Sequence, residues 1–295
     1  MAEPRTSDAT AGERGQLTLR PFADAPGAEV LGLQAAHIDA ALFPAVYEAF
    51  LTYQLLLFRD QDLPPAAQVA FARHFGEVQI HVMNQYHASG HPELYYLSNL
   101  GADGKPNGVH PDRGTMAWHT DGSWRPVTGQ ATILFAEQVP SSGGGTGFAD
   151  MYRALETLAP AEQARLADLK AVHNLDFSRR RRHGEDPMTE AQRREVPPVA
   201  HPIVRTHPET GRKCLFLGDH AECIEGMDYD QGRALIEDLN ARAIAGTRVY
   251  RHRWRPGDLM VWDNRCLQHK AEPYDTAHEP RVIRRCTVLG DAPYQ

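Results

Sequence analysis

Three short strand-like segments near the end of the chain restrict its fold more than any other feature. They are TRVYRHRW (247–254), GDLMVWDN (257–264) and PRVIRRCTVLGD (280–291). Each is rich in β-branched or aromatic residues and is bounded by turn-forming residues, a pattern typical of β-strands. No βαβ alternation and no glycine-rich phosphate-binding fingerprint accompany them, which disfavours a parallel sheet. We therefore expect antiparallel strands in the second half of the chain.

The other predicted elements fit one mixed domain. Strands are expected at 54–61, 93–100 and 131–139, a hairpin at 200–219, and helices at 35–53 (interrupted by Pro44), 64–76, 149–170 and 230–244. Loops or turns are expected at 101–115 and 140–147, and an irregular flap at 174–198. This order predicts an α+β fold with a double-sheet jelly-roll core and flanking helices. We expect a disordered arm at 1–16 and a single domain at 17–295.

Charge and composition disfavour several classes of protein. The chain has 295 residues and a formal net charge of −7, which argues against a nucleic-acid-binding protein. No apolar run approaches the roughly 18 residues of a membrane span, and the first residues carry no export signal. The four cysteines form no C-x-x-C pair, so we expect free thiols and a cytoplasmic location.

The stretch WHTDGSW (118–124) carries the first candidate site. In a strand, His119 and Asp121 would point to the same face, either as a hydrogen-bonded pair or as two-thirds of a metal site. A further histidine, His269, follows an apolar strand in VWDNRCLQHKA (261–271). Each feature alone is weak, but two histidines and one carboxylate can hold a ferrous ion and leave three coordination positions open. A structural zinc site would leave none.

Two arginines on the last predicted strand suggest an anionic ligand. Arg281 and Arg285 lie four residues apart and share one face of an otherwise apolar strand, whereas Arg284 faces the other way. Burying a guanidinium without a partner is costly. The partner is either a bound carboxylate, held in the bidentate geometry that arginine favours, or an internal aspartate or glutamate.

The order of these motifs resembles the taurine dioxygenase and 2,4-dichlorophenoxyacetate dioxygenase family. The motifs are His-x-Asp, Ser-Gly-Gly-Gly-Thr, Trp-Asp-Asn-Arg-x-x-x-His and Arg-x-x-x-Arg, and the resemblance extends from GAEVLGL (27–33) to TVLGD (287–291). It implies a double-stranded β-helix fold. It also implies Fe(II) as cofactor, with 2-oxoglutarate and O₂ as cosubstrates.

The resemblance assigns roles to five of the residues around the expected iron. His119, Asp121 and His269 match the family's metal ligands, which are also its catalytic residues. Thr146, in SGGGTG, and Arg281 match the residues that bind the far carboxylate of 2-oxoglutarate.

The resemblance also indicates where the substrate binds. Arg285 and His81 match residues that bind the acidic group of the substrate. Asn84 stands where taurine-type members carry a tyrosine, which disfavours taurine itself. We expect Trp124 and Asn99 to line the same pocket.

The predicted activity is hydroxylation, and in some cases subsequent cleavage, of a small organic acid such as an aryloxyalkanoate or alkylsulfonate. The alternative is a biosynthetic hydroxylase of an amino acid or natural-product acid. Two other classes stay open: a zinc hydrolase that uses the same three ligands, and a non-catalytic jelly-roll binding protein. Family members are often dimers or tetramers, so we expect a homo-oligomer.

Overall fold

An eight-stranded sheet forms the centre of the protein. The computed structural model describes residues 17–80, 87–111, 113–181 and 188–295. The strand order is β1-β2-β3-β14-β6-β16-β5-β4. The bounds are β1 Leu19–Pro21, β2 Ala28–Val30, β3 Leu55–Phe58, β4 His87–Ala88, β5 His91–Ser98, β6 Gly129–Gln138, β14 Leu259–Asp263 and β16 Val282–Leu289. All of its neighbours pair antiparallel except β2 and β3, which pair parallel.

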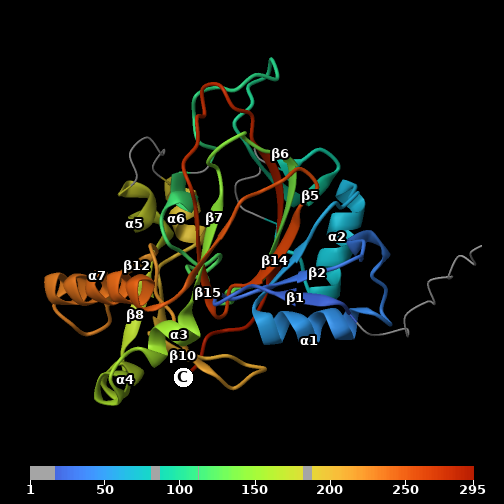
Figure 1. Ribbon diagram of the computed structural model, residues 1–295. Helices are drawn as coiled ribbons and strands as arrows, with labels where there is room; N and C mark the ends of the chain where they lie inside the picture. Colours follow the sequence, from blue (N-terminus) through green and yellow to red (C-terminus); the bar gives the residue numbers. More distant parts are fainter. Residues whose placement is uncertain (1–16, 81–86, 112, 182–187) are drawn as a thin grey trace, which may run out of the picture.

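A three-stranded sheet faces the larger one and completes the jelly roll (Figure 1). Its strands are β13 (Val249–His252), β7 (Thr146–Asp150) and β15 (Leu267–Ala271), with β7 in the middle. The space between the two sheets is filled by a core that includes Phe148, Trp262 and Ile283, each no more than 1% exposed. The predicted α+β jelly-roll fold is therefore confirmed.

Helices α1 (Phe43–Tyr53) and α2 (Pro65–Phe75) cover the other face of the large sheet (Figure 1). A second core, which includes Phe50, Phe71 and Val288, lies between them and the sheet. Successive side chains of β16 point alternately into the two cores, as expected for a strand that is buried on both faces. Ile283 belongs to the core between the sheets, whereas Cys286 and Val288 belong to the helical side.

The remaining elements extend the side of the smaller sheet. The strands are β8 (Lys170–His173), β9 (Val199–Pro202) and β12 (Ala221–Ile224), which form one sheet, and β10 (Val204–Thr206) and β11 (Lys213–Leu215), which form a hairpin. The helices are α3 (Met151–Glu156), α4 (Pro160–Ala167), α5 (Leu175–Arg180), α6 (Glu190–Glu195) and α7 (Tyr229–Gly246), with 3₁₀ turns η1 (Ala35–His37) and η3 (Arg113–Met116). Across these described residues, no helix is both long and apolar enough to cross a bilayer.

Several predicted elements are corrected by the structure. Pro44 does not interrupt a helix but occupies its first turn, where a missing N–H does no harm. The segment 149–170, predicted as one helix, contains two, because Pro160 starts a second helix. This second helix ends at Ala167, before β8 begins at Lys170. The predicted irregular flap contains α5 and α6, whose first turns are capped by Asn174 and by a Thr189–Gln192 capping box. The predicted turn at 140–147 is shorter than expected, because strand β7 already begins at Thr146.

The expectations for the domain bounds and for the cysteines have different outcomes. The predicted disordered arm at 1–16 lies outside the described residues, and the single domain at 17–295 stays a prediction. All four cysteines are free thiols, and only Cys223 is not fully buried.

His173 gives the fold a predicted pH dependence. Its ring is fully buried, stacks on Phe216 at 5.3 Å between centroids, and has no hydrogen-bond partner on either nitrogen. Burial lowers the pKa of His173 to about 3. In the unfolded chain the pKa is about 6.5, so the unfolded state binds the proton more readily. This residue's contribution is fully present above about pH 6.5 and declines as the pH falls toward the folded pKa, by up to about 1.4 kcal/mol per pH unit.

Urea unfolding at pH 7.5 and 5.5 measures this contribution. We expect the free energy of unfolding to fall less between these two pH values in His173→Phe, which keeps an aromatic ring against Phe216, than in the wild type. His37→Phe, at an exposed position, is the control and is expected to follow the wild type. Equal losses in wild type and His173→Phe would contradict the prediction.

Candidate metal centre

His119 and His269 are joined by their own backbones. The N–H of His119 donates to the carbonyl of His269 at 3.1 Å, and the N–H of His269 donates back at 2.9 Å. This isolated antiparallel bridge attaches the segment before β6 to strand β15. The two imidazole rings consequently lie side by side, with 4.1 Å between their centroids.

The expected strand through His119 and Asp121 is wrong. The pairing stops after one bridge, and Asp121 begins a turn. Gly122 has φ +71°, a left-handed conformation that side-chain-bearing residues rarely adopt. A Cβ at this position would also lie 2.9 Å from the backbone nitrogen of Gly129. The turn, rather than strand alternation, brings the carboxylate beside the imidazoles.

The three predicted ligand side chains converge. Nε2 of His119 is 3.7 Å from Oδ1 of Asp121, and Nε2 of His269 is 3.8 Å from Oδ2. One candidate ligand atom from each residue lies within 4.8 Å of the other two, and all three residues are buried. Nδ1 of His119 lies 2.8 Å from the carbonyl of Ala117. Because that carbonyl only accepts, Nδ1 carries the proton, and Nε2 presents its lone pair to the site.

The electrostatics favour the protonation states that a metal ion needs. Burial raises the pKa of Asp121, but Arg285, His269 and His119 outweigh it and hold the pKa well below its usual range. Burial and the neighbouring His119 hold the pKa of His269 well below its usual range. At neutral pH the site therefore presents a carboxylate and a neutral imidazole, the forms that coordinate metals. These donors fit a divalent transition-metal ion.

Arg281 is a buried cation that lacks an acidic partner among the described residues. It is 3% exposed, and its Nε donates to the carbonyl of Gly144 at 3.3 Å. In the described part of the chain, no aspartate or glutamate forms an ion pair with it. Burial lowers the pKa of Arg281 to about 10, so it stays charged at neutral pH. Such a group is suited to receive a carboxylate from a ligand.

Thr146, at the start of β7, is the other residue predicted to bind the cosubstrate. It is 3% exposed, and its hydroxyl oxygen accepts the indole N–H of Trp254 at 2.9 Å. That bond uses a lone pair and leaves the hydroxyl proton available to a ligand oxygen. The turn before Thr146 packs against Arg281: a Cβ at Gly144 would lie 3.5 Å from Cδ of Arg281.

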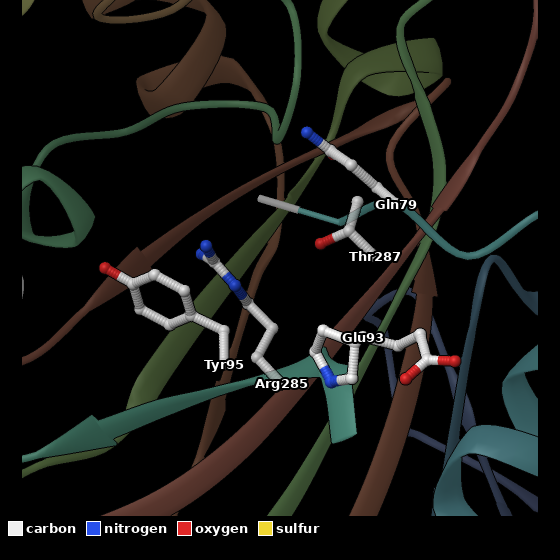
Figure 2. A pocket seen from close by; sticks show the side chains of 6 residues that line it. Gln79, Glu93, Tyr95, Arg285 and Thr287 are labelled. Atoms are coloured by element: carbon white, nitrogen blue, oxygen red, sulfur yellow. The ribbon is translucent and has the colours of Figure 1, made fainter. Parts of the chain in front are cut away.

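Arg285, on β16, lies beside Asp121 of the His-Asp-His cluster. Its Nη1 is 3.6 Å from Oδ1 of Asp121, and its guanidinium lies 4.7 Å from the centroid of Tyr95. A small cavity of about 10 Å³ beside it is lined by Gln79, Pro92, Glu93, Tyr95, Arg285 and Thr287. Figure 2 shows the guanidinium between the Tyr95 ring and Thr287, with the Glu93 carboxylate turned away. Nε2 of Gln79 is buried and has no hydrogen-bond partner.

The other predicted substrate residues are placed differently. His81 and Asn84 lie outside the described residues. Asn99 is fully buried: its amide donates to the carbonyls of Thr276 and Glu279 at 3.0 and 2.9 Å. Its Oδ1 accepts the backbone N–H of Arg281 at 2.8 Å. The structure therefore gives Asn99 a supporting role, because it anchors the chain at Arg281. Trp124 is 5% exposed in the turn after Asp121, and its contact with substrate stays a prediction.

A second group of possible metal ligands, which the sequence did not predict, is an internal ion pair. His207, Asp263 and Cys266 also bring ligand atoms within 4.8 Å of one another. Both oxygens of Asp263 are already engaged, since Arg265 donates to them at 2.8 and 2.7 Å and His207 lies at 3.0 Å. Burial raises the pKa of the Cys266 thiol well above its usual range, so it is not the thiolate that binds metals.

A jelly roll that holds two histidines and one carboxylate between its sheets defines the 2-His-1-carboxylate class of metal-dependent oxygenases. The chain belongs to the family described as "Taurine catabolism dioxygenase TauD, TfdA family", whose family model matches residues 18–287. Its relatives are named as α-ketoglutarate-dependent dioxygenases. The chain is accordingly an oxidoreductase that uses 2-oxoglutarate (α-ketoglutarate) and O₂.

Two relatives and one solved structure indicate how close the similarity is. A (S)-phenoxypropionate/α-ketoglutarate dioxygenase from Sphingobium herbicidovorans is 35% identical over 278 residues, which is 90% of this chain and 92% of the relative. A pentalenolactone F synthase from Streptomyces arenae is 33% identical over 296 residues, 94% of this chain and 97% of the relative. The crystal structure of AAD-2 with Mn(II) and N-oxalylglycine has a TM-score of 0.83 at 36% identity, covering 94% of this chain and 99% of that one.

The sequence did not point to Thr132, Asn264 or Gln79, although all three are buried near the site. Thr132 is an ordinary strand residue in sequence, and Gln79 precedes the expected His81. Asn264 lies within the Trp-Asp-Asn-Arg motif, directly after a predicted buried strand. A polar side chain at such a position needs a hydrogen-bond partner, and this could have pointed to a role near the site.

Proposed function

We propose that the protein is an Fe(II)- and 2-oxoglutarate-dependent dioxygenase that hydroxylates a small organic acid of the aryloxyalkanoate or alkylsulfonate type. Two observations carry the proposal together: the buried His-Asp-His cluster, and Arg281, a buried cation for which the described part of the chain offers no acidic partner. Two imidazoles and a carboxylate suit ferrous iron. When bound, iron supplies the O₂-dependent oxidation that couples decarboxylation of 2-oxoglutarate to hydroxylation of the substrate.

The residues of the chain position the two organic reactants. Arg281 holds the far carboxylate of 2-oxoglutarate by an ion pair, and Thr146 donates its neutral hydroxyl to the same carboxylate; both hydrogen bonds are charge-assisted. The bond between Thr146 and Trp254 fixes the direction in which the threonine hydroxyl points. His119, Asp121 and His269 would hold the iron, and a set of three protein ligands would leave coordination positions for the reactants. Positioning of this kind is the main contribution of the protein to the rate.

Arg285 is proposed to bind the acidic group of the substrate. It lies on the same strand as the cosubstrate residue Arg281, and its guanidinium is 3.6 Å from the metal-binding Asp121. A substrate acid held there lies next to the iron. The similarity to a phenoxypropionate dioxygenase supports an aryloxyalkanoate as the first choice. Whether the product is a stable alcohol or falls apart depends on the atom attached to the hydroxylated carbon.

Replacing Arg285 separates substrate binding from cosubstrate binding. We expect Arg285→Gln to raise the KM for the substrate by at least about tenfold, since a charged hydrogen-bond partner is worth roughly 1.5–3 kcal/mol, and to change the KM for 2-oxoglutarate by less than about threefold. Initial rates of succinate formation give both constants. Because Arg285 also contacts Asp121, Mn(II) affinity is measured in the same variant. Equal losses for both reactants at unchanged metal affinity would contradict separate roles.

An anaerobic titration tests the proposed function. Apoprotein is loaded with Fe(II) and 2-oxoglutarate, and its visible charge-transfer band is followed as aryloxy acids, alkylsulfonates and amino acids are added. We expect the charge-transfer band to form only when both Fe(II) and 2-oxoglutarate are present, and its wavelength to shift when the correct substrate is added. O₂ is then admitted and succinate is measured. Turnover with Zn(II) alone would favour a zinc hydrolase, and ligand binding without succinate would favour a binding protein.

A biosynthetic oxygenase is the second candidate. The similarity to a pentalenolactone F synthase, which extends over 94% of this chain, favours it. Adding natural-product acids to the same panel distinguishes the two candidates, because the correct substrate couples succinate to its own oxidation in a ratio near one. We also propose a homo-oligomer, a dimer or tetramer, and a cytoplasmic location. Light scattering of the purified protein tests the former.

A further inference from the structure

Two buried side chains lie behind the metal-binding carboxylate. The hydroxyl of Thr132, on β6, is 2.6 Å from Oδ2 of Asp121, and Nδ2 of Asn264 is 2.9 Å from that hydroxyl. Thr132 is fully buried and Asn264 is 1% exposed. Thr132 is opposite Trp262 in the β6–β14 register, and Asn264 follows β14 directly. The contacts therefore connect β14, β6 and the turn at Asp121.

The donor and the acceptor of each hydrogen bond in this series, from Asn264 through Thr132 to Asp121, can be assigned. Oδ1 of Asn264 is 3.0 Å from the indole nitrogen of Trp262 and 3.3 Å from the backbone nitrogen of Asp121. Both are N–H groups that can only donate, so this atom of Asn264 is the oxygen and the other is the amide nitrogen. The amide nitrogen donates to Thr132. The single proton of the Thr132 hydroxyl is then directed to Asp121.

The backbone of β6 packs closely against both Asp121 and Asn264. A Cβ at Gly129 would lie 2.7 Å from the carbonyl oxygen of Asp121 and 3.4 Å from Nδ2 of Asn264. The backbone of Asn264 is attached to β6 as well, since its N–H donates to the carbonyl of Gln130 at 2.8 Å. A hydrogen bond to an ionised group in such a dry interior is strong.

Arg285 competes for the same carboxylate. Its Nη1 is 3.6 Å from Oδ1 of Asp121, which is longer than a hydrogen bond. A small rotation of the carboxylate would convert this approach into a bidentate ion pair, which arginine favours. That pair would withdraw the oxygens from the metal and occupy the proposed acid-binding guanidinium. The bond from Thr132 to Oδ2 opposes this rotation.

We propose that Thr132 and Asn264 are positioning residues that hold Asp121 in its metal-binding orientation and away from Arg285. This inference rests on the proposed function only in taking Asp121 as a metal ligand. It predicts that loss of the Thr132 hydroxyl weakens metal binding and substrate binding together, whereas the KM for 2-oxoglutarate, measured at saturating metal, stays unchanged because Arg281 is not affected. A residue that only stabilised the fold would not produce this selective pattern.

The test compares Mn(II) affinity across matched variants of the apoprotein, by calorimetry and by the electron paramagnetic resonance signal of free Mn(II). We expect Thr132→Val, which keeps the shape but has no hydroxyl, to raise the Kd about 10- to 100-fold, as loss of an outer partner of a metal ligand does. Thr132→Ser restores the donor and is expected within about threefold of the wild type. Thr247→Val removes a hydroxyl that donates to the backbone of Asp150 and is the control.

Asn264→Asp provides a second, independent variant. Its side chain still accepts from Trp262 but has no N–H to donate to Thr132, so the threonine hydroxyl can turn away from Asp121. We expect the same rise in Kd. Folding is checked by circular dichroism, and if Thr132→Val does not fold, Asn264→Asp carries the test. Folded variants that bind Mn(II) as tightly as the wild type would overturn the inference. Failure of the wild type to bind Mn(II) would overturn the proposed function instead.

Discussion

Replacing Asp121 with alanine is expected to abolish 2-oxoglutarate turnover and metal binding. The variant loses one of the three ligands and the negative charge of the cluster. It also leaves the two buried imidazoles and Arg285 without the carboxylate that they share. The loss of affinity should exceed the roughly 10- to 100-fold that follows removal of a residue behind a ligand. Mn(II) binding to the apoprotein and succinate release by the iron-loaded enzyme measure the two effects separately.

Asp275→Ala is the matched control for this substitution. Asp275 is an exposed aspartate that hydrogen-bonds His278 at 2.9 Å, and its loss should leave metal binding and turnover unchanged. Wild-type turnover in Asp121→Ala would remove the assignment of the metal site. Lost turnover with unchanged Mn(II) affinity would place the role of Asp121 elsewhere in the reaction.

Replacing Arg281 with methionine is expected to raise the KM for 2-oxoglutarate by about 30-fold to several thousand-fold. Truncating one partner of a buried, hydrogen-bonded charge pair costs about 2–5 kcal/mol, and every 1.4 kcal/mol is a factor of ten. Stability should respond in the opposite sense. Because Arg281 has no acidic partner in the described chain, removing its charge relieves a desolvation penalty. The free energy of unfolding of the apoprotein should therefore stay constant or rise.

Arg284→Met on the same strand is the control with the reverse outcome. Arg284 faces the helices, and its Nε lies 3.0 Å from Oε1 of Glu137. Its loss should lower the free energy of unfolding in urea and leave the KM for 2-oxoglutarate near the wild-type value. A KM changed less than threefold in Arg281→Met would contradict the assigned role, as would a large loss of stability.

The sequence predicted which three side chains cluster better than it predicted how the backbone brings them together. His119, Asp121 and His269 could be selected because their residue types and order match one ligand set. The reason for their proximity was not visible, since one backbone bridge and the left-handed Gly122 replace the expected strand. Strand periodicity cannot report a pairing that is only one residue long.

Elements that depend on tertiary pairing were the hardest to predict. The jelly roll and the long helix α7 follow from apolar periodicity, which is strong over many residues. The short strands β1, β2, β8 and β12 have three or four residues each and exist because a neighbour pairs with them. The supporting role of Asn99 was likewise hidden, because its partners at Thr276 and Glu279 are distant in sequence.

The backbone bridge between His119 and His269 also determines when the His-Asp-His cluster can form. Its two halves are separated by 269 − 119 = 150 positions of the chain. During synthesis at about 5–20 residues per second, the first two ligands leave the ribosome well before the third. Contacts this distant in sequence form late, because a long loop must close first. The nascent protein therefore lacks the complete His-Asp-His cluster until the segment that carries His269 has been made and has paired.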